Sequence, residues 1–236
     1  MILIDLSQIM VASTMMSMGK DQSQVDISMV RHMVLNSLRM YRTKYHKEYG
    51  ELVLCCDGRH SWRREHFPQY KASRKTNRDA DSRDWTQIFG CLDTIKSELR
   101  EFFPYKYLEI DEAEADDIIG VLAKTWNEPI MIISGDKDFI QLQTHKNVKQ
   151  YSPITKKLVT ANNPYNYLKE HILRGDSSDG IPNFLSADDC LVEGVRQTPV
   201  SKKKVEVWLT QNPEEICTNA EMAERWKRNS QLTQFD

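Results

Sequence analysis

Residues 130–138 read Ile-Met-Ile-Ile-Ser-Gly-Asp-Lys-Asp: four apolar residues, a turn, and two acids. The same pattern, a short apolar run followed by an acid, occurs at Ile2–Asp5 and at Leu52–Asp57. Runs of this kind, without polar alternation, are typical of strands that are buried on both faces of a parallel sheet. We therefore expect three core strands, each with an acid at the carboxyl edge of the sheet, where ligands bind in open α/β folds.

Helical periodicity fills the intervals between these runs. Apolar residues recur at spacings of three or four along residues 30–45 and 88–99. The alternation predicts an α/β fold with a mostly parallel central sheet flanked by helices, and the part after about Pro164 is expected to be mostly helical. The further expected elements are strands at Tyr105–Ile110 and Val148–Ser152, and helices at 84–102 and Glu114–Trp126.

Composition limits the class of protein. The chain has 236 residues, of which 40% are hydrophobic and 28% charged, so it can bury a core. No apolar run approaches the roughly 20 residues that cross a bilayer, and the start lacks the basic leader of a signal peptide. Five cysteines without a CxxC pair disfavour a disulfide framework and a zinc site. We expect a cytoplasmic protein in a reducing compartment, with no membrane partner.

The formal net charge of −2 conceals segregated charges. Seven basic residues and one acid lie between Arg59 and Arg78, and a second basic run includes Lys202, Lys203 and Lys204. A charge run alone is as often a solvated face as a binding site. Aromatic residues within the first run favour nucleic acid, because bases stack on such rings; they are Trp62, Phe67 and Tyr70.

Acids gather where strands end. An Asp after a strand is usually a helix cap or turn residue, and an acid in a first helical turn can simply favour the helix dipole. Many carboxylates at one sheet edge, however, repel one another unless cations lie among them. Oxygen ligands favour Mg²⁺ or Mn²⁺, and two such ions can hydrolyse a phosphodiester. The candidate residues are Asp5, Asp57, Glu114, Asp116, Asp117, Asp136, Asp138, Asp176 and Asp179.

Signatures of other chemistries are absent from the sequence. There is no GxGxxG, GxxxxGK[ST], GxSxG or HExxH pattern, which disfavours dinucleotide, P-loop, hydrolase-elbow and zinc-protease sites. The combination of an acid cluster with a basic, aromatic segment favours a metal-dependent nuclease.

Several ordered strings resemble the 5′-nuclease (flap endonuclease) superfamily. They are Glu114-Ala-Asp-Asp117, Ser134-Gly-Asp-Lys-Asp-Phe139, Gly175-Asp-Ser-Ser-Asp-Gly-Ile-Pro182, and Asp57-Gly58 followed by Phe67-Pro-Gln-Tyr-Lys-Ala-Ser-Arg74. Within the superfamily the likeness is greatest to the ribonucleases H of T-even bacteriophages, as in Leu6-Ser-Gln8, Ser28-Met-Val-Arg-His32 and Asn147-Val-Lys-Gln-Tyr-Ser-Pro153. The likeness runs from Ile2 to about the end of the chain.

This resemblance implies a PIN-like nuclease fold in which residues 1–160 form the α/β core, with a helical arch at 71–87. Residues 161–236 would be a mostly helical part with a divergent helix-hairpin-helix-like DNA-binding region. Asp5, Asp57, Glu114, Asp116 and Asp117 would form a tighter metal site, and Asp136, Asp138, Asp176 and Asp179 a second. Catalytic roles would fall to Lys71 and Arg74, which would meet the scissile phosphate, and to Asp116. The residues expected to contact nucleic acid are Arg63, Arg64, Tyr70 (by stacking), Lys71, Arg74, Lys75, Lys202, Lys203 and Lys204.

The resemblance further implies a Mg²⁺-dependent 5′-3′ exonuclease and flap endonuclease with ribonuclease H activity, using two ions for which Mn²⁺ substitutes. It would remove RNA primers and adjacent DNA in phage-type replication, in the host cytoplasm if phage-encoded. Expected partners are DNA and RNA·DNA hybrids at 5′ flaps, nicks and forks, together with replication proteins such as a single-strand-binding protein or clamp. The expected oligomeric state is a monomer.

Three departures and two alternatives accompany this reading. Family members commonly have Asp-Asn-Ile-Pro-Gly where this chain has Asp179-Gly-Ile-Pro-Asn183, and residues 192–199 replace a glycine-rich hairpin that binds a monovalent cation. The chain is also expected to be truncated relative to the family. The alternatives are a PIN-like ribonuclease without flap activity and a catalytically silent nucleic-acid-binding module. The basic segment and the Gly175–Pro182 motif disfavour the first, and the complete set of nine acids disfavours the second.

Overall fold

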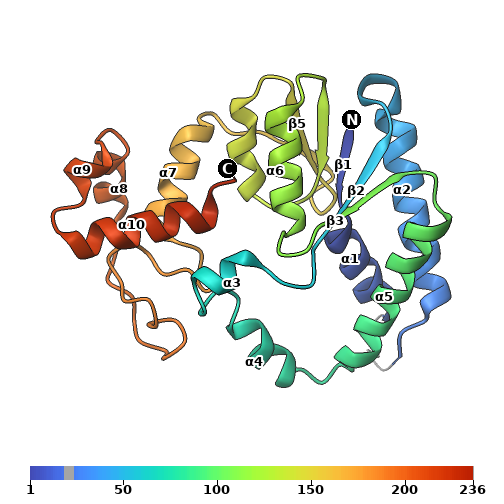
Figure 1. Cartoon of the computed structure of the whole chain (residues 1–236), viewed down its shortest axis with the longest axis horizontal. Helices are drawn as coiled ribbons and strands as arrows, with labels where there is room; N and C mark the ends of the chain where they lie inside the picture. Colours follow the sequence, from blue (N-terminus) through green and yellow to red (C-terminus); the bar gives the residue numbers. More distant parts are fainter. Residues whose placement is uncertain (19–23, 236) are drawn as a thin grey trace. The chain divides into compact units, whose positions relative to one another are not determined.

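The computed structural model describes residues 1–18 and 24–235, and it divides into two compact units (Figure 1). Unit 1 comprises Met1–His60 and Asp81–Thr160. Unit 2 comprises Ser61–Ala80 and the chain from Ala161 onward. Each unit is therefore assembled from two separate stretches of sequence.

Unit 1 is built on one six-stranded sheet with the strand order β3-β2-β1-β4-β5-β6. All neighbouring strands are parallel except β6, which runs antiparallel to β5 at the edge. The predicted α/β fold with a mostly parallel sheet is confirmed, whereas the short edge strand β6 was not predicted. The strands are β1 (Ile2–Asp5), β2 (Leu52–Cys56), β3 (Lys106–Glu109), β4 (Ile130–Ile133), β5 (Val148–Ser152) and β6 (Lys157–Val159).

Helices cover both faces of this sheet, which explains why every residue of β1, β2 and β4 is buried. One face packs against α1 (Leu6–Met18), α2 (Ile27–Tyr49) and α5 (Trp85–Phe102), whose apolar residues form the main core. On the other face lie α6 (Ala115–Thr125) and the 3₁₀ helix η1 (Asp138–Thr144) (Figure 1).

The ends of α2 follow local rules. Asp26 caps its start, because its Oδ1 accepts hydrogen bonds from the backbone N–H groups of Ser28 (2.9 Å) and Met29 (3.2 Å). Gly50, with φ of +81°, ends it. Helix α1 was not predicted, because it follows β1 directly and no turn residue separates Asp5 from Leu6.

Unit 2 is helical, as expected for the C-terminal part. Its second core packs Phe184 edge-on against Trp208 and Trp226, at centroid distances of 5.2 and 6.1 Å. Residues 175–201 hold turns and one isolated bridge, between Asp176 and Ile181. The helices are α3 (Trp62–His66), α4 (Ser73–Asp79), α7 (Pro164–Arg174), α8 (Lys202–Trp208), α9 (Pro213–Ile216) and α10 (Ala220–Thr233).

The expected core at 1–160 includes residues 61–80, which the structure groups with the C-terminal part in unit 2. The reason is a set of contacts to the C-terminal part. Arg63 Nε donates to the Leu232 carbonyl (2.8 Å), and the Lys71 N–H donates to the Asp179 carbonyl (2.7 Å). Phe67 and Tyr70 share an apolar cluster with Ile181 and Leu232. The expected arch at 71–87 is therefore divided between the units after Ala80.

The structure also bears on the cysteines and on membrane-spanning helices. All five cysteines are free thiols. No helix in residues 1–18 or 24–235 has both the length and the apolar character needed to span a membrane.

Candidate metal centre and nucleic-acid contacts

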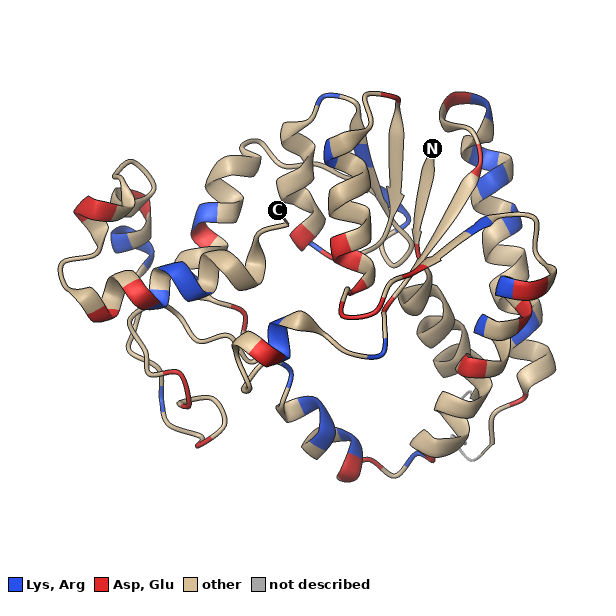
Figure 2. Ribbon diagram, viewed as in Figure 1, with Lys and Arg blue, Asp and Glu red and all other residues tan. Residues whose placement is uncertain are grey.

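Three acids of unit 1 follow neighbouring strands. The register pairs Asp5, at the end of β1, with Cys55, and it pairs Ile4 with Ile133 of β4. Asp57 and Asp136 follow β2 and β4 by one and three residues, so all three acids come to the carboxyl edge of the sheet. Figure 2 shows acidic residues along the ribbon at this edge of unit 1. We call the acids at the ends of these strands and at the start of α6 the carboxylate edge.

Asp5 is the most constrained member of this edge, with 8% of its surface exposed. Its Oδ1 accepts from the Gln8 N–H (3.1 Å), and its Oδ2 accepts from Ser134 Oγ (2.9 Å). Burial raises the pKa of the Asp5 carboxyl to about 6, and the charges of Asp57 and Asp136 act in the same direction. A buried carboxylate beside other carboxylates fits a site for a hard cation, because a bound cation would relieve this repulsion.

Asp57 is held by hydrogen bonds from two helices. Ser7 Oγ donates to its Oδ2 (2.7 Å), and the Ala115 N–H at the start of α6 donates to its Oδ1 (2.9 Å). The next residue must be glycine, because a Cβ on Gly58 would collide with the Ile110 carbonyl oxygen. The β2 end is thereby fixed against the loop that leads into α6.

Asp136 lies in a loop that side-chain amides hold in place. Gln150 Nε2 donates to the carbonyls of Ser134 (3.0 Å) and Asp136 (2.5 Å), and Gln8 Oε1 accepts from the Gly135 N–H (2.6 Å). The Asp138 N–H donates to Asp136 Oδ1 (2.9 Å). Sequence reasoning missed Ser134 and Gln150 as supports, because their partners lie 129 and 16 residues away.

The remaining acids of unit 1 open α6. Glu114 is its N-cap, and Asp116 and Asp117 lie in its first turn. The Glu114 N–H donates to Asp117 Oδ2 (2.9 Å), one half of a capping box. Asp117 therefore helps to cap the start of α6, as acids in a first helical turn often do, and it also belongs to the carboxylate edge.

In unit 2, Asp179 is surrounded by residues of the basic segment. Arg74 Nη2 lies 2.6 Å from its Oδ1, Lys71 Nζ lies 3.6 Å from its Oδ2, and Tyr70 donates its hydroxyl to Oδ2 (3.2 Å). Gly180 permits this approach, since its φ is +75° and a Cβ there would lie 2.6 Å from the Gln69 carbonyl oxygen. The structure therefore brings one expected metal ligand together with both expected phosphate-binding cations.

Two of the residues expected to contact nucleic acid, Arg63 and Tyr70, are buried. The Arg63 side chain is 2% exposed, with its guanidinium bonded to Leu232 and placed 4.6 Å from the Trp62 ring centroid. Tyr70 is 3% exposed within the apolar cluster, so its ring is covered by protein and does not offer a stacking face to a base. Six other residues expected to contact nucleic acid are exposed: Arg64, Arg74, Lys75, Lys202, Lys203 and Lys204. Figure 2 shows the basic residues of α4 along that helix.

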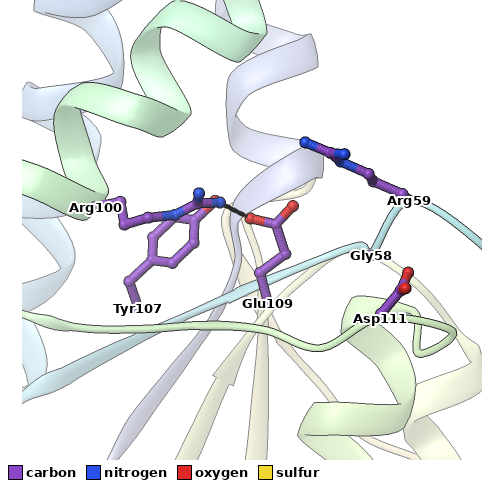
Figure 3. Close-up of a pocket in the computed structure, with 6 residues that line it drawn as sticks. All are labelled: Gly58, Arg59, Arg100, Tyr107, Glu109 and Asp111. Atoms are coloured by element: carbon purple, nitrogen blue, oxygen red, sulfur yellow. Dashed lines mark hydrogen bonds and ion pairs between the residues drawn. The ribbon is translucent and has the colours of Figure 1, made fainter.

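A pocket of about 500 Å³ in unit 1 lies beside the end of β2 (Figure 3). Arg100 forms an ion pair with Glu109, which also accepts from the Tyr107 hydroxyl (2.9 Å). Asp111 lies 3.1 Å from His60 Nδ1. Arg59 lines the pocket without a side-chain hydrogen bond or ion pair to any described residue. The pocket thus offers a cation, close in sequence to Asp57, that is unpaired among the residues the structure describes.

Comparison with known proteins agrees with this arrangement. Residues 1–171 match the family described as "5′-3′ exonuclease, N-terminal resolvase-like domain". The chain is 35% identical to the ribonuclease H of Enterobacteria phage T4, over 99% of this chain and 80% of that protein. It is also 31% identical to DNA polymerase I of Bacillus subtilis, over 56% of this chain and 16% of the polymerase.

Solved structures of bacteriophage T5 enzymes share the fold. A T5 5′-exonuclease with bound divalent metal ions (zinc) has a TM-score of 0.70 at 15% identity, covering 100% of this chain and 89% of that chain. A T5 flap endonuclease variant, solved with DNA and metal ions, has a TM-score of 0.69 at 15% identity, covering 99% and 88%. The family match and the phage relative show that this chain belongs to the 5′-nuclease superfamily of 5′-3′ exonucleases and flap endonucleases, which are nucleic-acid hydrolases.

Proposed function

We propose that this chain is a Mg²⁺-dependent 5′-3′ exonuclease and flap endonuclease with ribonuclease H activity. It would remove RNA primers and the DNA that follows them. The observation that carries this proposal is the 35% identity to a phage ribonuclease H across 99% of the chain. The crowding of carboxylates around buried Asp5 supports the dependence on a divalent cation.

The acids would divide between two ions. Asp5, Asp57, Glu114, Asp116 and Asp117 would hold the first, and Asp136, Asp138, Asp176 and Asp179 the second. When bound, two such ions supply an activated water and stabilise the leaving oxygen of a phosphodiester. The chain's own part is to fix these carboxylates. Ser7 and Ser134 do so by donating to carboxylate oxygens. Gln8 and Gln150 hold the backbone of the loop that carries Asp136.

Substrate contacts would come from the basic segment. Lys71 and Arg74 would donate to the scissile phosphate, so that charge developing on its oxygens is stabilised. The exposed lysines at 75 and 202–204, together with Arg64, would contact the phosphate backbone and position the strand. We include in the proposal a monomer that acts in the cytoplasm, in a host cell if the chain is phage-encoded, with replication proteins such as a single-strand-binding protein or a clamp.

A cleavage assay tests this function directly. A 5′-flap duplex and an RNA·DNA hybrid, each labelled at either end, are incubated with the protein in Mg²⁺ or in EDTA. Short Mg²⁺-dependent products from the 5′ end are expected with both substrates. Binding without cleavage in Mg²⁺ and Mn²⁺ would instead indicate a silent binding module, and cleavage of RNA strands without any flap cutting would indicate a PIN-like ribonuclease.

A further inference from the structure

We propose that His171 is a nitrogen ligand of the cation held by Asp176, so that this metal site has a mixed nitrogen and oxygen donor set. The inference deepens the proposed function and rests on it, because it concerns the second of the two expected ions. All six histidines of the sequence lie in the described ranges. Among them, His171 is the one that unit 2 places against an expected metal ligand, Asp176.

The turn at the end of α7 creates this placement. The Gly175 N–H donates to the His171 carbonyl (2.8 Å) and closes the last helical turn. Gly175 has φ of +66°, and a Cβ there would collide with the carbonyl oxygens of Ile181 and Pro182. This glycine therefore permits a sharp reversal that returns Asp176 to the side of His171.

The two oxygens of Asp176 have different surroundings. Oδ1 accepts from the Ser178 N–H (2.8 Å) and from Ser178 Oγ (2.6 Å), which fixes the orientation of the carboxylate. Oδ2 takes part in neither bond and lies 3.9 Å from His171 Nε2. Both side chains are largely covered, at 15% exposure for His171 and 23% for Asp176. The His171 ring is also stacked on Tyr167, with an interplanar angle of 8°.

The separation of 3.9 Å is informative about what belongs between these atoms. It is too long for a hydrogen bond. Two ligand atoms that each lie about 2.1 Å from one ion are separated by about 3 Å at right angles and by about 4.2 Å when opposite. The observed distance between Nε2 and Oδ2 falls within this range, so both atoms can contact one ion without moving apart.

The donor set has a consequence for metal preference. Carboxylate oxygens suit Mg²⁺, whereas imidazole nitrogen suits transition-metal ions. Asp179, the other expected ligand in unit 2, is already balanced by Lys71 and Arg74. We therefore expect His171 to raise the affinity of this site for transition-metal ions relative to Mg²⁺.

The test is pulsed electron paramagnetic resonance of Mn²⁺ added to the full chain. A coordinated imidazole gives a ¹⁴N coupling at Mn²⁺, and this coupling should change to that of ¹⁵N when the wild-type protein is labelled with ¹⁵N-histidine. In His171→Gln the nitrogen coupling should disappear, and the Kd for Mn²⁺ should rise about tenfold. His32→Gln, which removes an exposed imidazole on α2, is the matched control and should leave both unchanged.

The outcomes separate this inference from the function on which it rests. Mn²⁺ that binds to the wild type without nitrogen coupling, or with coupling that persists in His171→Gln, would overturn the role of His171 and leave the nuclease proposal standing. Absence of the coupling would indicate a water molecule between the ion and His171, whereas persistent coupling would indicate a different nitrogen ligand. A wild-type protein that binds no Mn²⁺ at all would overturn the metal-dependent function as well.

Discussion

Asp5 of unit 1 and Asp179 of unit 2 have opposite electrostatic surroundings. Asp5 is buried beside other carboxylates, and burial raises its pKa to about 6. Asp179 lies within 3.6 Å of the Lys71 ammonium and 2.6 Å of the Arg74 guanidinium. Within the described part of the chain, Asp5 has no ion pair with a basic side chain, whereas Asp179 has two.

This difference separates the two roles that carboxylates have in the molecule. On the carboxylate edge, an added cation relieves repulsion and should stabilise the folded state by mass action. At Asp179, an added cation competes with Lys71 and Arg74, which are themselves expected to meet the substrate. The predictions below test this contrast, beginning with the largest effect.

Asp136→Asn should lower turnover by about a thousandfold or more, because losing one charge at a metal site removes several kcal/mol of transition-state stabilisation. DNA binding should remain measurable, since the basic residues are untouched. Single-turnover cleavage and a binding titration provide the two readouts. Asp93→Asn, at an exposed position on α5, is the control and should behave as wild type. Full activity of Asp136→Asn would refute the metal assignment.

Lys71→Ala should slow the chemical step by about a hundredfold to a thousandfold, the usual effect of removing one donor to developing charge. Single-turnover rates at saturating substrate measure this step without the contribution of binding. The exposed Lys47→Ala on α2 is the matched control. If the Lys71→Ala rate equals that of the wild type, Lys71 only balances Asp179 and contacts the substrate without taking part in catalysis.

Arg63→Ala and Arg64→Ala distinguish structure from recognition within one helix. Removing Arg63 should lower the free energy of unfolding by about 3 kcal/mol, because it deletes a buried, hydrogen-bonded charge. Removing exposed Arg64 should leave stability within about 0.5 kcal/mol and weaken DNA binding. Urea denaturation and binding titrations check both. Equal stability of the two variants would contradict the structural role of Arg63.

Asp5→Asn and Asp179→Asn should change stability in opposite directions in the metal-free protein. The folded pKa of Asp5 lies above the ordinary aspartate value of 3.8, so ionised Asp5 destabilises the fold progressively as pH rises from about 4 to about 6 and fully above that. Asp5→Asn should therefore raise stability at pH 7.5 by about 2 kcal/mol and have little effect near pH 4. Asp179→Asn should lower stability by about 1–2 kcal/mol, because it leaves two cations unbalanced.

Thermal unfolding in EDTA at both pH values measures this pair of effects. Adding Mg²⁺ should raise the Tm of the wild type and reduce the advantage of Asp5→Asn. A Tm for Asp5→Asn below that of the wild type at pH 7.5 would show that its hydrogen bonds to Gln8 and Ser134 outweigh the repulsion.

Arg59→Ala should have the smallest effect, weakening DNA binding a few-fold and reducing the salt dependence by about one phosphate contact. The Arg59 side chain has no partner in the described chain, so stability should not change. Binding at several salt concentrations gives the slope. Arg100→Ala is the comparison. Because Arg100 is already paired with Glu109, its removal should change this slope less than the removal of Arg59.

The sequence specified the sheet and the positions of its acids well, since an apolar run that ends at an acid predicts both at once. It could not specify α1, which begins without a turn, or β6, a three-residue edge strand. It also could not reveal that Arg63 and Tyr70 are buried. Composition made both look like nucleic-acid contacts, but their environment is set by Leu232 and Ile181, more than 100 residues away in the chain. Asp117 shows the remaining ambiguity, because one carboxylate can both cap a helix and face a cation.

The bond from Arg63 to the Leu232 carbonyl joins residues that are 169 positions apart. Closing so long a loop is slow, and its entropy must be overcome before the contact contributes to stability. Unit 2 therefore cannot finish folding until the last helix has been synthesised, whereas all the strands of unit 1 precede Ala161. A ribosome-bound chain that has released only unit 1 would carry the carboxylate edge while the segment with Lys71 and Arg74 still lacked its core.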